Sequence, residues 1–540
     1  MKTLRACRQC RESKRKCCRQ DPCEACEACR NRRLQCSAAT SAVNPISRND
    51  PGPLGVESTQ DSQSVTGLPQ GIVTELVENY LTRVHGGPHW IFHPMTLRSQ
   101  VSEGSVKDAL LYAICAIGSK FSLDAKIRAE EGRLAAGAKH SLHADLENIC
   151  IENVQVCILL ATLSSGNCQP STEALYVGYC RTTTYSHSGS TLKGIAISMI
   201  DILKLKRSPT AYPTCSITGE TERRILWSLY IAERWCSSGL GLRCRMDMAA
   251  DSCHDVPTTM DESTWYSIRP GGQQTTPTIA YKPGILTHMV NLVSHFTAIQ
   301  DLNRQIAIGG LTTAEVEKRV ADLADKLQYW HSSLPSDLQM TVQNLGDKLQ
   351  KDLARDFAVL HLTYHHFSTL LHFNFLESYQ GKADSSSHHK HVELCKQHAS
   401  SFSNLLRLSH QMGRFAVEYP IIGHMTVVSS SVLVHTLLFG DVKELPDARK
   451  KLDSNFDILV QLQQWWPCTE AMNVCLLRLD SYRLDGWMVR YLLEHSRALE
   501  RRELQTVPPN IDMGSMNKPP RAEQLLEIGR YTDFSSFHSS

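Results

Sequence analysis

Residues 7–36 read CRQCRESKRKCCRQDPCEACEACRNRRLQC and contain eight cysteines. Two Cys-x2-Cys pairs stand out, and six residues after each pair comes another cysteine, so that two halves have the same spacing: Cys7, Cys10 and Cys17, then Cys26, Cys29 and Cys36. The thiolates of a Cys-x2-Cys turn can bind one zinc ion, which takes four ligands in structural sites. Two zinc ions need eight bonds, and six thiolates supply eight only if two of them bridge. The spacing therefore predicts a cluster of two zinc ions.

The same stretch is strongly basic. Residues 1–36 contain eleven Lys and Arg against four Asp and Glu, a net charge of about +7 before metal binding. Such a dense positive charge on a small domain is typical of a surface that binds the phosphates of nucleic acid, and it disfavours a purely structural zinc module. The whole chain has a net charge of only +2, so residues 37–540 carry about −5. The signal for nucleic acid is thus confined to the N-terminal stretch.

A disulfide framework is the competing interpretation of these cysteines. It would need an oxidising compartment, but Met1 is followed by a charged segment without the apolar stretch of a secretory signal. The other twelve cysteines, from Cys115 to Cys475, have no paired spacing, as expected of buried thiols in a reducing cytosol or nucleus. The most apolar segment, residues 425–439, is interrupted by serines and His435 and is expected to be too short and too polar to span a membrane.

The cysteine arrangement resembles that of the fungal binuclear zinc-cluster transcription factors. Their first helix usually reads Ala-Cys-x2-Cys-Arg-x2-Lys-x-Lys-Cys, and this chain matches it from Ala6 to Cys17. The resemblance implies that Cys7 and Cys26 bridge the two ions and that Lys14 reads the bases of CGG-type triplets in double-stranded DNA. It also implies nuclear localisation, the transcription machinery as a partner, and a set of side chains that mainly bind phosphates: Arg11, Arg15, Lys16 and Arg19.

Two spare cysteines, Cys18 and Cys23, depart from the family pattern. The segment Pro22-Cys23-x2-Cys26 also resembles the family's Pro-Cys-x2-Cys, so Cys23 is an alternative to Cys26 or Cys29 as a ligand. We prefer Cys26 and Cys29 because only this choice leaves six residues before Cys36, as in the first half.

A flexible linker is expected to follow the cluster. We assign residues 1–40 to the zinc cluster and residues 41–70, which are rich in Ser, Pro and Gly, to the linker. Many members of the family dimerise through a leucine-heptad coil just after the cluster, and this linker has no such repeat. A homodimer would therefore need contacts between the helical parts of two chains.

The rest of the chain has a helical pattern. Apolar residues recur at three- and four-residue spacing in segments 72–84 and 106–117, segment 154–163 is nearly all apolar, and no run of alternating strands is present. The sequence predicts a mainly α protein, in which the small cluster and the linker precede a large all-α regulatory domain. We place this domain at residues 71–485 and a partly disordered tail at residues 486–540.

Several helical segments resemble the middle homology region, the regulatory domain that accompanies the cluster in this family. Tyr80–His85 with Ile91–Pro94 resembles its opening motif, and Glu222–Arg234 resembles its most recognisable helix. The resemblance extends over roughly residues 70–480. One departure is Gly241-Leu242-Arg243, where the family usually has Gly-Arg-Pro.

Residues 179–193 interrupt this pattern with a polar insertion that has no helical stripe. A surface loop and a translated intron are equally acceptable explanations. A capping box at Thr312 and Glu315 precedes the stripe Val316, Val320, Leu323, Leu327 and Trp330. We interpret this stripe as one core-facing helix rather than a coiled coil.

Two groups of histidines are the remaining candidate ligands. His365 and His366 lie in a predicted amphipathic helix at residues 357–376, and residues 388–391 (HHKH) lie in an expected Ser-rich connector. Structural or solvated roles are favoured for both groups over metal binding.

No catalytic residues are predicted, because the chain has no Gly-rich phosphate loop, no Gly-x-Ser-x-Gly elbow and no HExxH. Two classes of function remain. The first is a sequence-specific regulator of RNA polymerase II genes, and the second is a zinc-dependent interaction protein or an enzyme with a cryptic site in the helical domain. The basic excess and Lys14-x-Lys16 favour the first.

Overall fold

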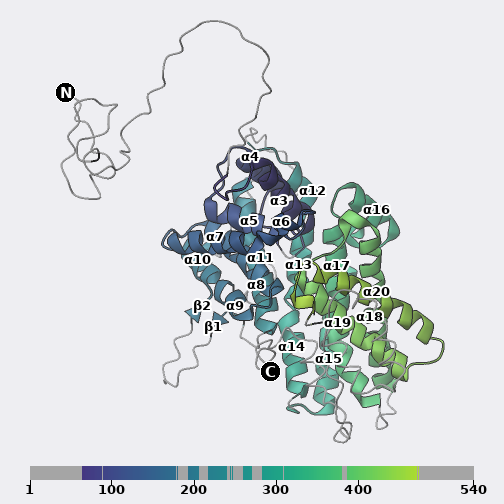
Figure 1. Cartoon of the computed structure of the whole chain (residues 1–540). Coiled ribbons are helices and arrows are strands. Elements are labelled where there is room, and N and C mark those ends of the chain that lie inside the picture. The colour runs from purple at the N-terminus through teal and green to yellow at the C-terminus, as the bar shows by residue number, and fades with distance from the viewer. Residues whose placement is uncertain are drawn as a thin grey trace, which may run out of the picture. The chain divides into compact units, whose positions relative to one another are not determined.

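Helices dominate the part of the chain that the structure describes (Figure 1). In this computed structural model the chain divides into two units, residues 1–60 and 61–540, and the second contains every element named below. The described residues are Cys29 and the following positions: 64–87, 89–177, 179–180, 192–205, 217–239, 244, 246, 259–270, 282–307, 309–379, 386–470 and 472.

The elements before the middle of the chain are α3 (Gln70–Arg83), α4 (Pro94–Ser102), α5 (Asp108–Ser119), α6 (Ala125–Ala129), α7 (Glu131–Ala144), α8 (Ile151–Gly166), α9 (Pro170–Tyr176), β1 (Tyr179–Cys180), β2 (Leu192–Lys193), α10 (Ile195–Leu203) and α11 (Ile217–Gly239). Those after it are α12 (Glu262–Ser267), α13 (Ile285–Val293), α14 (Phe296–Ala307), α15 (Thr313–Ser333), η2 (Ser336–Leu338), α16 (Val342–Gln350), α17 (Ala354–His372), η3 (Phe373–Tyr379), α18 (Ser386–Gln411), η4 (Gly413–Phe415), α19 (Pro420–Phe439) and α20 (Leu445–Gln463).

Local sequence explains where several of these helices begin. Pro94 opens α4, where its missing N–H costs nothing, and the preceding His93 accepts a hydrogen bond from the backbone N–H of Thr96. The predicted capping box is confirmed, since Thr312 and Glu315 cap the first turn of α15 reciprocally. Each cap satisfies N–H groups that the first helical turn leaves without partners.

One hydrophobic core connects the helices from Leu68 to Met472. In the first half α5 packs against α3, α7 and α8, and in the second half α17, α18, α19 and α20 pack successively against one another. Figure 1 shows the first group in purple and blue and the second in green. The two groups share the core because α8 contacts α19, while α11 contacts both α8 and α13.

The predicted helical stripes face this core. Val73, Leu76 and Tyr80 of α3 are buried, as is nearly all of α8. In α15 the residues Val320, Leu323, Leu327 and Trp330 are buried within the same chain, which confirms a core-facing helix. Apolar burial of this kind contributes roughly 25 cal/mol per Å² and is the main source of helix stability here.

Helix α19 is longer than the apolar segment 425–439 that the sequence shows. It begins at Pro420 and is long and apolar enough to cross a membrane by length and composition, but 78% of its window Pro420–Leu437 is buried inside the structure. This burial is that of a core helix.

Two expectations need correction in detail. Residues 179–193 are not wholly loop, because their ends pair as the antiparallel strands β1 and β2, with Tyr179 opposite Lys193. The helix expected at residues 357–376 instead begins at Ala354 and changes at Phe373 into the 3-10 helix η3. It is also buried on nearly all sides rather than amphipathic, since it packs against α15, α18 and α19.

Candidate functional site

The predicted metal and DNA ligands lie almost entirely outside the described residues. Cys29 alone is described, as a buried helical residue that is not in a disulfide. Five other predicted ligands, namely Cys7, Cys10, Cys17, Cys26 and Cys36, and the basic residues Arg11, Lys14, Arg15, Lys16 and Arg19 lie outside this part of the chain. In the described part of the chain, eight cysteines after residue 36 are free thiols, and five of these are buried as expected: Cys115, Cys157, Cys236, Cys395 and Cys468.

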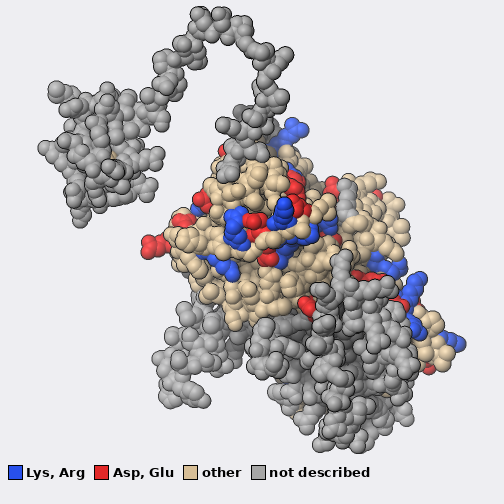
Figure 2. Space-filling view, in the orientation of Figure 1, with Lys and Arg blue, Asp and Glu red and all other residues tan. Residues whose placement is uncertain are grey.

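The helical domain does not show a single basic face where it can be seen. In Figure 2 Lys and Arg side chains alternate with Asp and Glu on the described surface. Several exposed Lys and Arg side chains pair with acidic ones, as Arg98 does with Glu78 at 2.6 Å and Lys326 with Asp322 at 2.9 Å. Mixed charge of this kind agrees with a nucleic-acid signal confined to the N-terminal stretch.

A buried charge cluster, made of Glu220, Arg224 and Glu262, fixes the helix that resembles the family's most recognisable segment. Arg224 of α11 is fully buried and donates from Nε to Glu220 at 2.8 Å and from Nη1 to Glu262 at 3.3 Å. Its Nη2 donates to the backbone carbonyl of Met260 at 2.5 Å. Glu262 in turn accepts from the backbone N–H of Ile285 at 2.6 Å, at the start of α13. One guanidinium therefore ties together α11, α12 and α13.

The double glycine after α3 has a structural role. Gly86 and Gly87 have φ of 88° and 68°, a region that L side chains rarely adopt. A Cβ on Gly86 would lie 2.3 Å from Asp356 Oδ1, and one on Gly87 would lie 2.3 Å from the Tyr419 ring. Without side chains here, the N–H of Gly87 donates to Asp356 at 2.9 Å. The turn that follows α3 thus also docks this helix onto α17.

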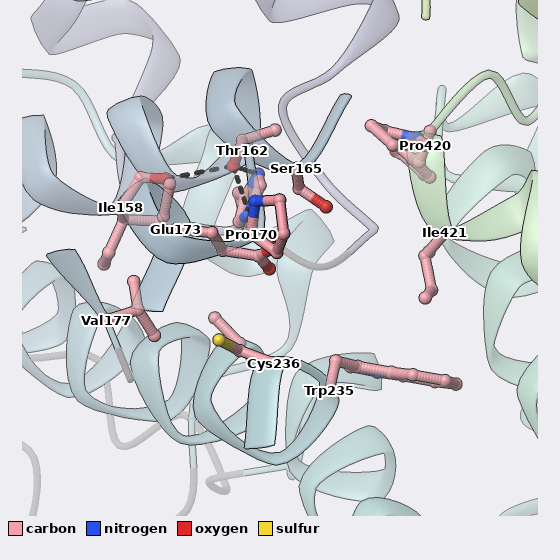
Figure 3. Close-up of a pocket in the computed structure, with 14 residues that line it drawn as sticks. Ile158, Thr162, Ser165, Pro170, Glu173, Val177, Trp235, Cys236, Pro420 and Ile421 are labelled. Carbon is pink, nitrogen blue, oxygen red and sulfur yellow. Dashed lines mark hydrogen bonds between the residues drawn. The ribbon is translucent and has the colours of Figure 1, made fainter. Parts of the chain in front are cut away.

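A cavity of about 80 Å³ lies between α8, α9, α11 and the start of α19 (Figure 3). This volume is several times the roughly 10–15 Å³ that one water needs. Seven of the fourteen side chains that line it carry polar or sulfur groups: His89, Thr162, Ser165, Glu173, Trp235, Cys236 and Tyr419. The other seven are apolar.

The polar side of the cavity carries one carboxyl group. Glu173 of α9 bonds to Ser165 of α8, and burial raises the pKa of its carboxyl to about 8 although this hydrogen bond lowers it. Thr162 donates its hydroxyl to the carbonyl of Ile158 at 3.0 Å and accepts from Nε2 of His89 at 3.0 Å. Burial lowers the pKa of His89 to about 4, so this imidazole is neutral.

Sequence reasoning missed this cavity. Glu173, Ser165 and Trp235 come from three helices, and none of them belongs to a short motif. The only local signal is one acidic residue, Glu173, in a short segment with apolar neighbours. Such a pattern is too common in helices to indicate a cavity. The turn between α8 and α9 brings Glu173 back against Ser165, with Gln169 N–H bonded to the carbonyl of Ser164 at 2.8 Å.

The histidine groups lie on α17 and α18. His365 contacts His398 of α18, whereas His366 packs against Trp235 of α11 and His424 of α19. His388 and His391 lie in the first turns of α18 and not in a connector, and both are buried. His391 Nδ1 lies 3.2 Å from Nδ1 of His372, and the His391 ring packs on Phe375 at 4.3 Å between centroids. The described residues contain no group of three or more His, Cys, Asp or Glu that could hold a metal. Packing, the favoured interpretation, agrees with these contacts.

Comparison with known proteins shows what the helical domain is similar to. Residues 77–332 match the family model described as "Fungal specific transcription factor domain". The Zn(2)-C6 fungal-type transcription factor FTF1c of Fusarium oxysporum f. sp. lycopersici is 20% identical over 80% of this chain and 48% of its own length. FTF2 of the same fungus is 21% identical over 77% of this chain and 40% of its own.

A third relative, an uncharacterised transcriptional regulatory protein of Schizosaccharomyces pombe, is 21% identical over 60% of this chain and 34% of its own length. The chain thus spans about half or less of the length of these relatives. All of these matches are to regulators of transcription and none is to an enzyme, in agreement with the absence of predicted catalytic residues. Residues 77–332 are therefore similar to a domain type found in regulators of transcription.

Proposed function

We propose that the chain is a nuclear, sequence-specific DNA-binding regulator of RNA polymerase II genes. One combination of observations supports this proposal. A basic stretch with the Cys-x2-Cys-x6-Cys spacing twice over precedes, in one chain, a domain that matches the fungal-specific transcription factor family. Two of the relatives are named as Zn(2)-C6 fungal-type transcription factors. In this proposal residues 1–40 bind DNA, residues 71–485 regulate that binding or its outcome, and residues 41–70 link the two.

Six thiolates of the N-terminal stretch would hold two zinc ions, with Cys7 and Cys26 as the bridging ligands. Cys10, Cys17, Cys29 and Cys36 would complete the two tetrahedra, and this all-sulfur donor set is one that zinc prefers. The ions supply folding energy and no reaction chemistry. The role of these residues is to hold a short basic helix in a fixed orientation.

Lys14 would read the sequence, because guanine presents two acceptors, O6 and N7, in the major groove. An ammonium group at the end of a short helix can donate to both. The neighbouring cations Arg11, Arg15, Lys16 and Arg19 would mainly bind phosphates, which position the helix without reading bases.

Binding isotherms of the full-length protein on CGG-containing and random duplexes test this assignment. Lys14→Ala should weaken cognate binding by about 1–3 kcal/mol and affect random duplex little. Arg15→Ala is the matched control, since the loss of a phosphate contact should weaken both duplexes and reduce the salt slope by about one. Equal weakening of both duplexes by Lys14→Ala would show that another residue reads the bases, and equal affinity of the unaltered protein for both would refute sequence-specific binding.

The number of chains on DNA is a separate part of the proposal. Without a heptad coil in residues 41–70, either a monomer binds one triplet or the helical domains hold two chains on paired triplets. Single and paired CGG sites distinguish these cases. A dimer held by the helical domain should prefer paired sites, and residues 1–70 alone should lose that preference.

A further inference from the structure

We infer that the cavity between α8, α9, α11 and α19 is a binding site for a small organic cation, an aliphatic primary amine, that pairs with the carboxylate of Glu173. This inference concerns the helical domain alone and stands whether or not residues 1–40 bind DNA. The argument rests on the size of the cavity, on the charge of its wall and on the contacts of Glu173.

The charge of the cavity wall favours a positively charged ligand. Glu173 is the one acidic side chain on the described wall, which contains no Lys or Arg. Its only basic residue, His89, is neutral because burial lowers its pKa to about 4. An anion would therefore meet a carboxyl group and no counter-charge. An ammonium ion would supply the positive partner that Glu173 does not find on the wall.

The hydrogen-bonding groups fit an ammonium head. A primary ammonium has three N–H donors and no acceptor. Next to the Glu173 carboxyl lies its bonding partner Ser165, whose hydroxyl oxygen is a second acceptor on the same side of the cavity. In Figure 3 these two side chains and Thr162 lie together, while Trp235 and Ile421 lie at other parts of the wall. Charge-assisted hydrogen bonds are about twice as strong as neutral ones, so a cation gains more here than an alcohol does.

The apolar wall fits a short alkyl chain. Ile158, Ala161, Val177, Ala232 and Ile421 line much of the rest of the cavity, and none of these side chains can form a hydrogen bond to a polar tail. With roughly 10–15 Å³ for one water-sized group, about 80 Å³ admits about five to eight non-hydrogen atoms. Pentylamine has this size and is a suitable probe, with 1-pentanol and butanoate as its neutral and anionic counterparts.

Binding of a cation should depend on pH, because it is coupled to the ionisation of Glu173. Burial raises the pKa of Glu173 to about 8, so about nine-tenths of the carboxyl groups carry a proton at pH 7. A cation binds the ionised form, and the carboxyl must then release nearly one proton to solvent. The affinity should consequently rise about tenfold per pH unit from pH 5 to 7 and level off near pH 8.

Other groups at the cavity do not titrate in this range. Burial lowers the pKa of His89 to about 4, and it raises the pKa of the Cys236 thiol and the Tyr419 phenol well above their usual values. A pH profile between 5 and 8 therefore reports on Glu173.

Isothermal titration of the full-length protein with pentylamine, in buffers of different ionisation enthalpy, tests the inference. We expect saturable binding with the pH slope and proton release given above. Glu173→Gln keeps the shape of the side chain and should weaken binding at least tenfold and abolish both the slope and the proton release. Glu152→Gln on the exposed side of α8 is the matched control and should change nothing.

A second variant keeps the test independent of the fold around Glu173. Ala232→Leu should fill the cavity from the apolar side and reduce the affinity while leaving Glu173 in place. Equal binding of pentylamine by Glu173→Gln, stronger binding of 1-pentanol or butanoate, or no saturable binding of any amine from methylamine to hexylamine would each overturn the inference. DNA is absent from this experiment, so its failure leaves the proposed DNA-binding function untouched.

Discussion

Residues 1–36 and the helical domain of residues 64–472 differ in what can stabilise each of them. Apart from cysteine, the first stretch has only Met1, Leu4 and Leu34 as large apolar residues, too few to form a core. The helical domain buries a continuous apolar cluster that connects nearly all of its helices. A segment as short and polar as the first must take its free energy of folding from metal–thiolate bonds, whereas the second takes it from water excluded from apolar surface. Conditions that remove the source of stability of one region should therefore leave the other region folded.

Removal of zinc should separate the two regions most sharply. Structural zinc contributes roughly 10–16 kcal/mol in small zinc modules, so a chelator should unfold residues 1–40 and abolish DNA binding. The thermal unfolding transition of the helical domain should not move, because its described residues contain no candidate metal site. Metal analysis before chelation should find two zinc ions per chain. One ion, or none together with disulfides, would contradict the cluster.

Single cysteine variants should show which cysteines bind the zinc ions. Cys26→Ser and Cys29→Ser should each lose metal, while Cys18→Ser and Cys23→Ser should keep both ions. The opposite outcome for Cys23 would place it among the ligands.

The buried charge cluster on α11 should give the next largest effect. Arg224→Met leaves Glu262 buried without its counter-ion and leaves Glu220 paired with Arg223 alone, and breaking a buried pair in this way typically costs about 3–5 kcal/mol of unfolding free energy. Arg304→Met is the control, since Arg304 pairs with Asp301 at 2.8 Å but both side chains are about half exposed, and such pairs contribute only ~0–1 kcal/mol. Denaturant unfolding of both variants measures the difference. A loss no larger than that of Arg304→Met would show that the cluster does not stabilise the domain.

The two regions also differ in how far their sequences predict them. The helical stripes in α3 and α15 were predictable because apolar residues repeat at three- and four-residue spacing within one segment, and α8 was predictable because its segment is nearly all apolar. The ion pair between Arg224 and Glu262 could not be predicted, because it joins two helices that are far apart in the sequence and no residue spacing indicates their contact. His388 was misplaced for a related reason. A Ser-rich, His-rich segment has low helical propensity, but packing of its rings against α17 and η3 outweighs that preference.

Acid should destabilise the helical domain through its buried histidines. Burial, with the nearby His391, His398 and Lys390, lowers the pKa of His372 to about 3, against about 6.5 in the unfolded chain. The unfolded state then binds more protons below pH 6.5, so stability is present above that pH and is lost as the pH falls toward 3. Between pH 7 and 5 this single group should cost about 2 kcal/mol.

His372→Gln should remove that part of the loss. Unfolding free energies at pH 7 and pH 5 give the difference, which should be smaller by about 2 kcal/mol in the variant than in the unaltered protein. His140→Gln, on the exposed side of α7, is the control. The same pH dependence in all three proteins would show that His372 does not titrate as its burial indicates.

The smallest expected effect concerns the capping box of α15, where stability comes from one local contact rather than from the core. Thr312 accepts the N–H of Glu315 at 3.4 Å, and Glu315 accepts the N–H of Thr312 at 2.9 Å, with both residues exposed. Thr312→Ala should therefore cost about 1 kcal/mol without a change in burial. Thr313→Ala, one position further along and also exposed, makes the same chemical change without removing a cap, and higher helix propensity of alanine should make it neutral or slightly stabilising. Equal unfolding free energies for these two variants would mean that the capping box adds nothing measurable to the stability of α15. The helix would then depend on its buried apolar stripe alone, as the helical domain depends on its core.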